Sequence, residues 1–191
     1  MFIINIYMRN YFKLFKHKAG FTLIELLVVI GILGVLAAAL IATIDPFEQL
    51  KKAQDANSKN TAVEFIGASI RYYTTHNTLP WTDTGAPAAC QTDPTPNGYP
   101  LSGNPQMSSC LDALVTDGEL KSGFTTVTTV LSTILVAGDS VGVTSCFRPI
   151  SKSQIRDNNT KFLLTGGTFV ASNTCVSQVG GTVTTCYWCS Q

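Results

Sequence analysis

The amino-acid sequence predicts an α+β fold in which a long helical region precedes a β-rich region. Three observations lead to this prediction. Residues 21–44 form an apolar run with a single charge, and the segment after it repeats apolar positions with helical spacing up to about residue 77. Short β-branched runs between glycine turns follow, among six cysteines that all lie beyond residue 89. Helices first and strands later are typical of α+β proteins.

The apolar run is long enough to cross a membrane. As a helix it would extend about 36 Å at about 1.5 Å per residue, whereas a hydrocarbon core is about 30 Å thick. Residues 1–20 contain four bases and no acid, which favours a cytoplasmic N-terminus. Two simpler interpretations, a cleaved secretory signal peptide and a plain membrane anchor, leave the charge at Glu25 unexplained.

Glu25 needs a physical reason because a carboxylate in a membrane costs a few kcal/mol and by default marks a functional residue. No lysine or arginine lies inside the apolar run, so its partner must come from another chain or from processing. Cleavage after Gly20 would create such a partner, the α-amino group of Phe21. An amine and a carboxylate about 4 Å apart attract by roughly 4 kcal/mol in a partly screened site.

This segment resembles the prepilin-type processing motif of type IV pilins and type II secretion pseudopilins. A Lys-Ala-Gly sequence ends at Gly20 and is followed by Phe-Thr-Leu-Ile-Glu and a long aliphatic run, which matches every position of the motif. The resemblance implies that a membrane-embedded aspartic peptidase, the prepilin peptidase, cuts between Gly20 and Phe21 and N-methylates Phe21. It also implies that Glu25 is unsatisfied in a lone subunit and is neutralised in a filament by a neighbour's Phe21 amine.

The resemblance further implies a pilin-like organisation of the chain. Residues 1–20 would be a leader peptide that is removed, 21–44 a transmembrane and assembly helix, 45–79 an amphipathic helix, and 80–191 an extracellular globular domain. In that fold one long helix lies half in the membrane and half on a small antiparallel sheet with disulfide-bonded loops. The apolar first residues differ from the short basic leaders of the family, so Met8 is the expected initiator and Met1 the alternative.

Beyond the apolar run, Pro46 predicts a kink or short break, because proline lacks an amide proton and disfavours helical geometry at the residue before it. An amphipathic helix is predicted from Phe47 to about Asn77. Its expected buried face consists of Leu50, Ala53, Val63, Ile66, Ile70 and Tyr73. Ion pairs are expected on the wet face at Glu48–Lys52, Lys51–Asp55 and Asp55–Lys59.

The rest of the chain is predicted to contain a loop, a short helix and strands. Six prolines mark residues 80–110 as a loop, and residues 109–120 as a short helix follow it. Strands are expected at 131–137, 141–147, 162–164 and 168–171, before a last hairpin that turns at Gly180-Gly181.

Six cysteines after a membrane-targeting segment indicate disulfides formed in an oxidising compartment. A bond between Cys90 and Cys110, which bracket most of the proline-rich loop, is the economical interpretation. A two-residue turn at Gly180-Gly181 would set Cys175 opposite Cys186, at a spacing that suits a disulfide. The third pair, Cys146–Cys189, follows by elimination.

The Cys-x-x-Cys sequence at 186–189 also admits a redox or metal role. Reactive pairs of this spacing open a helix, whereas these two cysteines lie on an expected strand and point to opposite sides. Zinc would need four suitably spaced ligands, and His17 and His76 are remote. His76 is expected to be a capping or surface residue. No metal, cofactor or catalytic site is predicted, and the chain is not expected to be an enzyme.

The predicted function is that of a structural subunit of a type IV pilus or pilus-like filament, polymerised through its N-terminal helix as a homo-oligomer or with other pilins. Before assembly the chain would be a single-pass protein of the cytoplasmic membrane, in contact with lipid, the prepilin peptidase and the assembly machinery. Afterwards it would form part of a surface filament. One alternative is a type II secretion pseudopilin, and another is a membrane-anchored extracellular binding module that never polymerises. A mildly acidic remainder gives no footprint for direct nucleic-acid binding.

Overall fold

The computed structural model describes residues 20–43, 45–92, 94, 98–172, 175 and 186–190. The chain divides into two compact units, residues 1–45 and residues 46–191. The described part of the first unit contains one helix, α2 (Leu23–Thr43). The second unit contains a long helix, α3 (Pro46–His76), shorter helices and a six-stranded antiparallel sheet, and the part of it that follows α3 is called the head below. The prediction of an α+β fold is therefore confirmed, while nearly all of the expected leader lies outside the described residues.

α2 follows the apolar run of the sequence. Its segment Leu23–Ile41 is 19 residues long, about 28 Å, and is apolar enough to cross a membrane by length and composition. Every large apolar side chain from Phe21 to Ile41 is at least 45% exposed. Such a helix, apolar on all sides, requires lipid or other helices to cover it.

The predicted break at Pro46 is present, because α2 ends at Thr43 and α3 (Pro46–His76) begins with that proline. Proline suits the first turn of a helix, where an amide proton would have no intrahelical acceptor. The predicted buried face of α3 is wrong except at Ile66. Leu50, Val63, Ile70 and Tyr73 are 40–62% exposed. The buried residues of α3 are Asp55, Ala62, Phe65, Ile66, Ala68, Ser69 and Tyr72.

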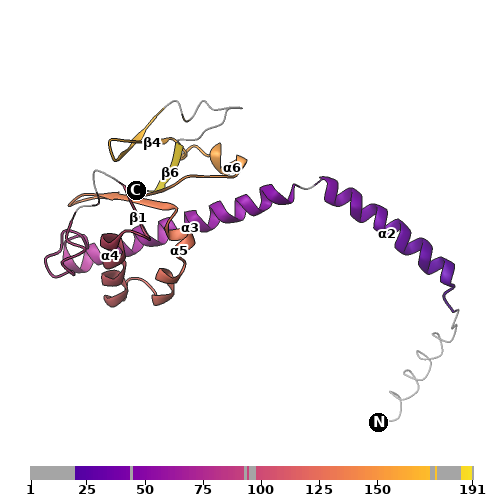
Figure 1. Cartoon of the computed structure of the whole chain (residues 1–191), viewed down its shortest axis with the longest axis horizontal. Helices are drawn as coiled ribbons and strands as arrows, with labels where there is room; N and C mark the ends of the chain where they lie inside the picture. The colour runs from indigo at the N-terminus through magenta and orange to yellow at the C-terminus, as the bar shows by residue number, and fades with distance from the viewer. Residues whose placement is uncertain are drawn as a thin grey trace, which may run out of the picture. The chain divides into compact units, whose positions relative to one another are not determined.

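The sheet of the head has the strand order β1-β2-β3-β6-β4-β5. Its last strand along the chain, β6, therefore lies between β3 and β4 and joins the two halves of the sheet. In Figure 1 the sheet and the α4–α5 segment lie on opposite sides of α3. The strands are β1 (Tyr99–Pro100), β2 (Ile134–Gly138), β3 (Val143–Phe147), β4 (Phe162–Thr165), β5 (Thr168–Ala171) and β6 (Cys186–Ser190).

The short helices differ from the prediction at their boundaries. The helix expected at 109–120 is α4 (Pro105–Thr116), which begins inside the predicted loop. It starts there because the Asn104 side chain accepts hydrogen bonds from the amides of Gln106 and Met107 and so caps the helix. The strand expected to begin at residue 131 starts later, because that position ends a helical turn. The remaining helices are η1 (Ser122–Thr126), α5 (Thr128–Leu131) and α6 (Lys152–Ile155).

The core of the head forms where α3 meets the sheet and the proline-rich loop. Phe65 of α3, Phe147 of β3 and Trp188 of β6 are at most 4% exposed, and the two rings of Phe147 and Trp188 lie 5.4 Å apart. Trp81, from the loop after α3, is 2% exposed, and its indole Nε1 donates to the Asp139 carbonyl. The loop is thereby attached to the β2–β3 turn.

Candidate processing and assembly site

The Gly20–Phe21 bond, at which processing was predicted, lies in an open part of the structure. Phe21 is 73% exposed, and a Cβ placed on Gly20 would meet no atom within 4 Å. Both residues precede the first turn of α2 and have no helical or strand geometry. An uncovered peptide bond outside regular secondary structure is one that a peptidase can reach.

The start of α2 has a capping box that joins Thr22 to Glu25. The Glu25 carboxylate accepts hydrogen bonds from the Thr22 amide at 2.9 Å and from the Thr22 hydroxyl at 2.6 Å. In return, the Glu25 amide donates to the Thr22 hydroxyl oxygen at 3.3 Å. Thr22 and Glu25 are thus the N-cap and third residue of the helix, the spacing at which these two residue types satisfy free amides.

This arrangement corrects one expectation about Glu25. The carboxylate was expected to be unsatisfied in a lone subunit, but in the structure its hydrogen bonds come from Thr22 of the same chain. No cation approaches it in the described part of α2, which contains no lysine or arginine. Its hydrogen-bonding capacity is therefore partly used, while its charge has no opposite charge within that helix. The sequence contained the signal, because Thr22-x-x-Glu25 before an apolar run is a capping-box pattern.

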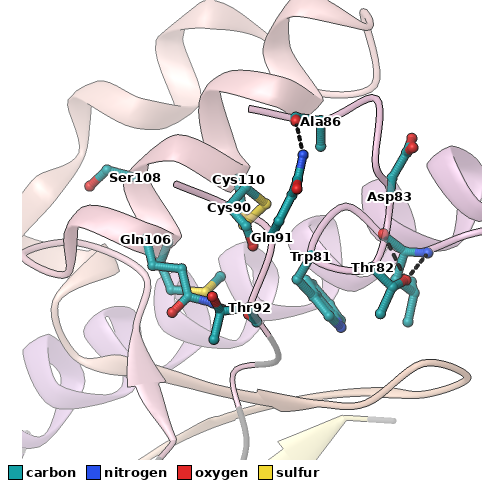
Figure 2. The surroundings of a disulfide bond; sticks show 12 residues. Trp81, Thr82, Asp83, Ala86, Cys90, Gln91, Thr92, Gln106, Ser108 and Cys110 are labelled. Carbon is teal, nitrogen blue, oxygen red and sulfur yellow. Dashed lines mark hydrogen bonds between the residues drawn. A yellow bond between two sulfur atoms is a disulfide. The ribbon is translucent and has the colours of Figure 1, made fainter. Parts of the chain in front are cut away.

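The structure contains three disulfides, and they join the same cysteines that the sequence favoured. Cys146 of β3 and Cys189 of β6 are directly opposed in the strand register, with a Cα–Cα distance of 4.1 Å. Cys90 and Cys110 tie the proline-rich loop to α4 with a Cα–Cα distance of 4.9 Å. In Figure 2 the Gln91 side chain beside this bond reaches the Ala86 carbonyl, at 2.6 Å.

The third disulfide, Cys175–Cys186, has a Cα–Cα distance of 5.8 Å. Its expected geometry was that of opposed residues in a hairpin, but Cys175 lies outside the strands that the structure describes. The described partners of β6 are β3 and β4. The expected turn at Gly180-Gly181 lies outside the described residues.

His76 is the last residue of α3, as the sequence predicted for a helix end. Its ring stacks on Tyr72 at 4.0 Å, and its Nε2 lies 3.6 Å from an Asp117 carboxylate oxygen. The Tyr72 hydroxyl in turn donates to Asp83 at 2.6 Å. These contacts attach the end of α3 to the loop and to α4. Across the residues that the structure describes, His, Cys, Asp and Glu side chains do not gather in threes as a metal site would require.

Comparison with known protein families identifies one matching region. Residues 15–41 match the prokaryotic N-terminal methylation motif, the signature of type IV pilins and pseudopilins. The match covers the Gly20–Phe21 bond, the capping box and most of α2. No curated protein and no solved structure matches the chain. The motif points to a structural subunit of the pilin type and implies processing by a prepilin peptidase.

Proposed function

We propose that the chain is a structural subunit of a type IV pilus or pilus-like filament. The observation that carries this proposal is the methylation motif at residues 15–41, read together with the local structure around Phe21. In this proposal the leader ends at Gly20, and Phe21 becomes the N-methylated first residue. α2 then anchors the subunit in the membrane until assembly, and the head extends outside the cell.

The exposed surface of α2 supports polymerisation through this helix. Its large apolar side chains are uncovered all around, so leaving the membrane would expose them to water unless other helices replaced the lipid. A bundle of such helices in a filament core would cover them. Copies of this chain, alone or with other pilins, are the proposed neighbours.

Glu25 is proposed to set the register between neighbouring subunits. Cleavage frees a cationic amine on Phe21, four residues before Glu25 in the sequence. The capping box holds the Glu25 carboxylate against Thr22, at the end of α2 where such an amine would lie. A neighbour's amine would supply the opposite charge that the described part of α2 lacks, and in an apolar bundle that attraction is only weakly screened.

The intact mass of the mature chain, purified from filaments, tests the processing step. The expected mass is that of residues 21–191 with one methyl group on Phe21. A chain that keeps residues 1–20, or that begins after Ala39, would instead indicate a membrane-anchored binding module. The absence of filaments, under conditions in which the chain is made and inserted into the membrane, would lead to the same conclusion.

Two substitutions at Glu25 separate its charge from its capping role. Glu25→Leu removes both, whereas the amide oxygen in Glu25→Gln can still accept hydrogen bonds from Thr22 without a charge. If the charge pairs with a neighbour's amine, both variants should be cleaved and methylated but fail to assemble. Assembly of Glu25→Gln at the normal level would show that Glu25 acts only as a helix cap and would refute its role in register.

A further inference from the structure

The N-terminal half of α3 packs against the head in an unusual way. Among its first sixteen residues, 46–61, the only fully buried side chain is that of Asp55. The apolar side chains of Phe47 and Leu50 in the same stretch are 74% and 62% exposed. A helix of about sixteen residues is only marginally stable in water by itself, so contacts with the head must stabilise it. Because its apolar side chains are exposed, hydrophobic burial does not supply those contacts.

Two carboxylates make the contacts that hydrophobic side chains do not. The Asp55 side chain is 3% exposed and accepts hydrogen bonds from the amides of Ile150, at 3.0 and 3.1 Å, and Ser151, at 2.7 Å. About two turns closer to the N-terminus of α3, Glu48 accepts a hydrogen bond from the Lys152 amide at 2.6 Å. Three successive amides, two from the end of the segment between β3 and α6 and one from the first residue of α6, thus donate to two acids of α3.

The positions of these acids continue the buried stripe of the helix. Glu48 and Asp55 are seven residues apart, and the next two steps of seven reach the buried Ala62 and Ser69. Residues seven apart lie almost on the same side of a helix. The side of α3 that faces the head therefore changes from small and apolar residues to carboxylates toward its N-terminus. The expected ion pairs of Asp55 on the wet face are accordingly wrong, because its carboxylate faces inward.

We propose that Glu48 and Asp55 form a carboxylate latch, which positions the N-terminal half of α3 on the head through the amides of residues 150–152. Burying a carboxylate is unfavourable unless hydrogen bonds replace its hydration, so the amides and Asp55 have to meet. Bonds from amides to a charged acceptor are stronger than those between neutral groups. Hydrophobic contacts have no fixed direction and tolerate small shifts of a helix along its axis. The latch instead fixes both the rotation of α3 about its axis and its position along that axis, relative to residues 150–152.

The latch has a consequence for assembly that rests on the proposed function. In a filament the head would be carried by a helix that is rigid almost to its first turn. Loosening the latch would leave α3 attached to the head mainly beyond Lys59, whose ammonium lies 4.9 Å from the Trp188 ring. Heads on frayed helices would assemble less efficiently than heads held in one orientation.

Amide hydrogen exchange of the full chain in detergent micelles tests the latch directly. In Asp55→Ala, the amides of Ile150 and Ser151 and those of residues 50–55 should exchange at least about tenfold faster. Glu48→Gln should have a smaller effect of the same kind, centred on Lys152. The control is Glu64→Gln, which removes an exposed acid of the same helix and should leave these rates unchanged.

Exchange at the β2–β3 pairs shows whether the head itself remains folded. If Asp55→Ala unfolds it, Asp55→Asn is used instead, because one carbonyl oxygen remains to accept an amide. Unchanged exchange at residues 50–55, with or without faster exchange at Ile150 and Ser151, overturns the proposal that the latch positions α3. These measurements use unassembled subunits, so their outcome is independent of whether filaments form. If Asp55→Ala does speed exchange at these amides, filament yield tests the effect on assembly. A lower yield for Asp55→Ala than for Glu64→Gln would support the expectation that loosening the latch impairs assembly, and equal yields would refute it.

Discussion

Loss of the Cys146–Cys189 disulfide should destabilise the head more than loss of either other disulfide. The bond closes a loop of 43 residues, and the chain-entropy relation gives about 4 kcal/mol for a loop of that length at 25 °C. Cys175–Cys186 lies within this loop and shortens it by about ten residues, which lowers the value to about 3.7 kcal/mol. The separations of 20 and 11 residues in the other two bonds correspond to about 3.3 and about 2.8 kcal/mol.

Urea unfolding of the full chain in micelles measures these losses. The chain has two tryptophans, Trp81 and Trp188, and both are buried in the head, so their fluorescence reports head unfolding without interference from α2. With a slope of about 2 kcal/mol per molar urea, replacing Cys146 and Cys189 by alanine should lower the midpoint by about 2 M. The two other pairs, replaced in the same way, are matched controls.

The order of the three losses decides whether the reasoning holds. All six cysteines are at most 7% exposed, so the packing lost with each pair is similar and loop length should set the order. If the 11-residue loop proved the most important, or if Cys146→Ala with Cys189→Ala cost less than 1 kcal/mol, the entropic argument would be wrong for this head. The position of β6 between the two halves of the sheet would then have to be stabilised by strand pairing alone.

Three further predictions concern single contacts. Gly138→Ala should destabilise the fold by about 1–3 kcal/mol and change tryptophan fluorescence, because the added Cβ would lie 2.6 Å from Cζ2 of Trp81. Gly123→Ala should have neither effect, because a Cβ at that position meets no atom within 4 Å. Thr22→Val should speed amide exchange in the first turn of α2, corresponding to a cap worth about 1 kcal/mol, while Thr22→Ser should not. The pKa of Asp83 is lowered first by the hydrogen bond from Tyr72 and next by that from the Gly85 amide. The ionised Asp83 carboxylate therefore stabilises the fold at any pH above its unfolded pKa, and this stabilisation is lost as the pH falls through its pKa in the folded protein. Tyr72→Phe should raise the Asp83 pKa toward its ordinary value and move that loss to higher pH, as an NMR titration would measure.

The parts of the fold that the sequence predicted well are those fixed by one dominant physical term. An apolar run of two dozen residues admits few structures other than a helix in an apolar environment, and α2 follows it closely. A proline just after that run determines where the next helix begins, because it suits only a first turn. The strand at Thr168–Ala171, beside a glycine turn, was predicted with its observed bounds for a similar reason.

The predictions failed where several weak terms compete. Apolar periodicity placed Val63, Ile70 and Tyr73 in the core, but α3 is rotated so that Ala62, Ser69 and Tyr72 are the buried residues. Small residues allow the helix to approach the sheet closely, and a count of apolar side chains does not register them. The start of α4 was missed because a single side chain, Asn104, decides it.

The carboxylates of the helical region show most clearly what pattern reasoning omits. The sequence suggested that Glu25 needs a partner from outside and that Glu48 and Asp55 pair with lysines in water. In the structure each of the three accepts at least one hydrogen bond from a main-chain amide. A main-chain donor is present at every residue but proline, so its position is invisible in composition and emerges only when the chain folds. A carboxylate at a helix position where a neutral side chain would have a lower free energy therefore marks a contact of defined geometry. Both the register proposed for Glu25 and the latch depend on such contacts.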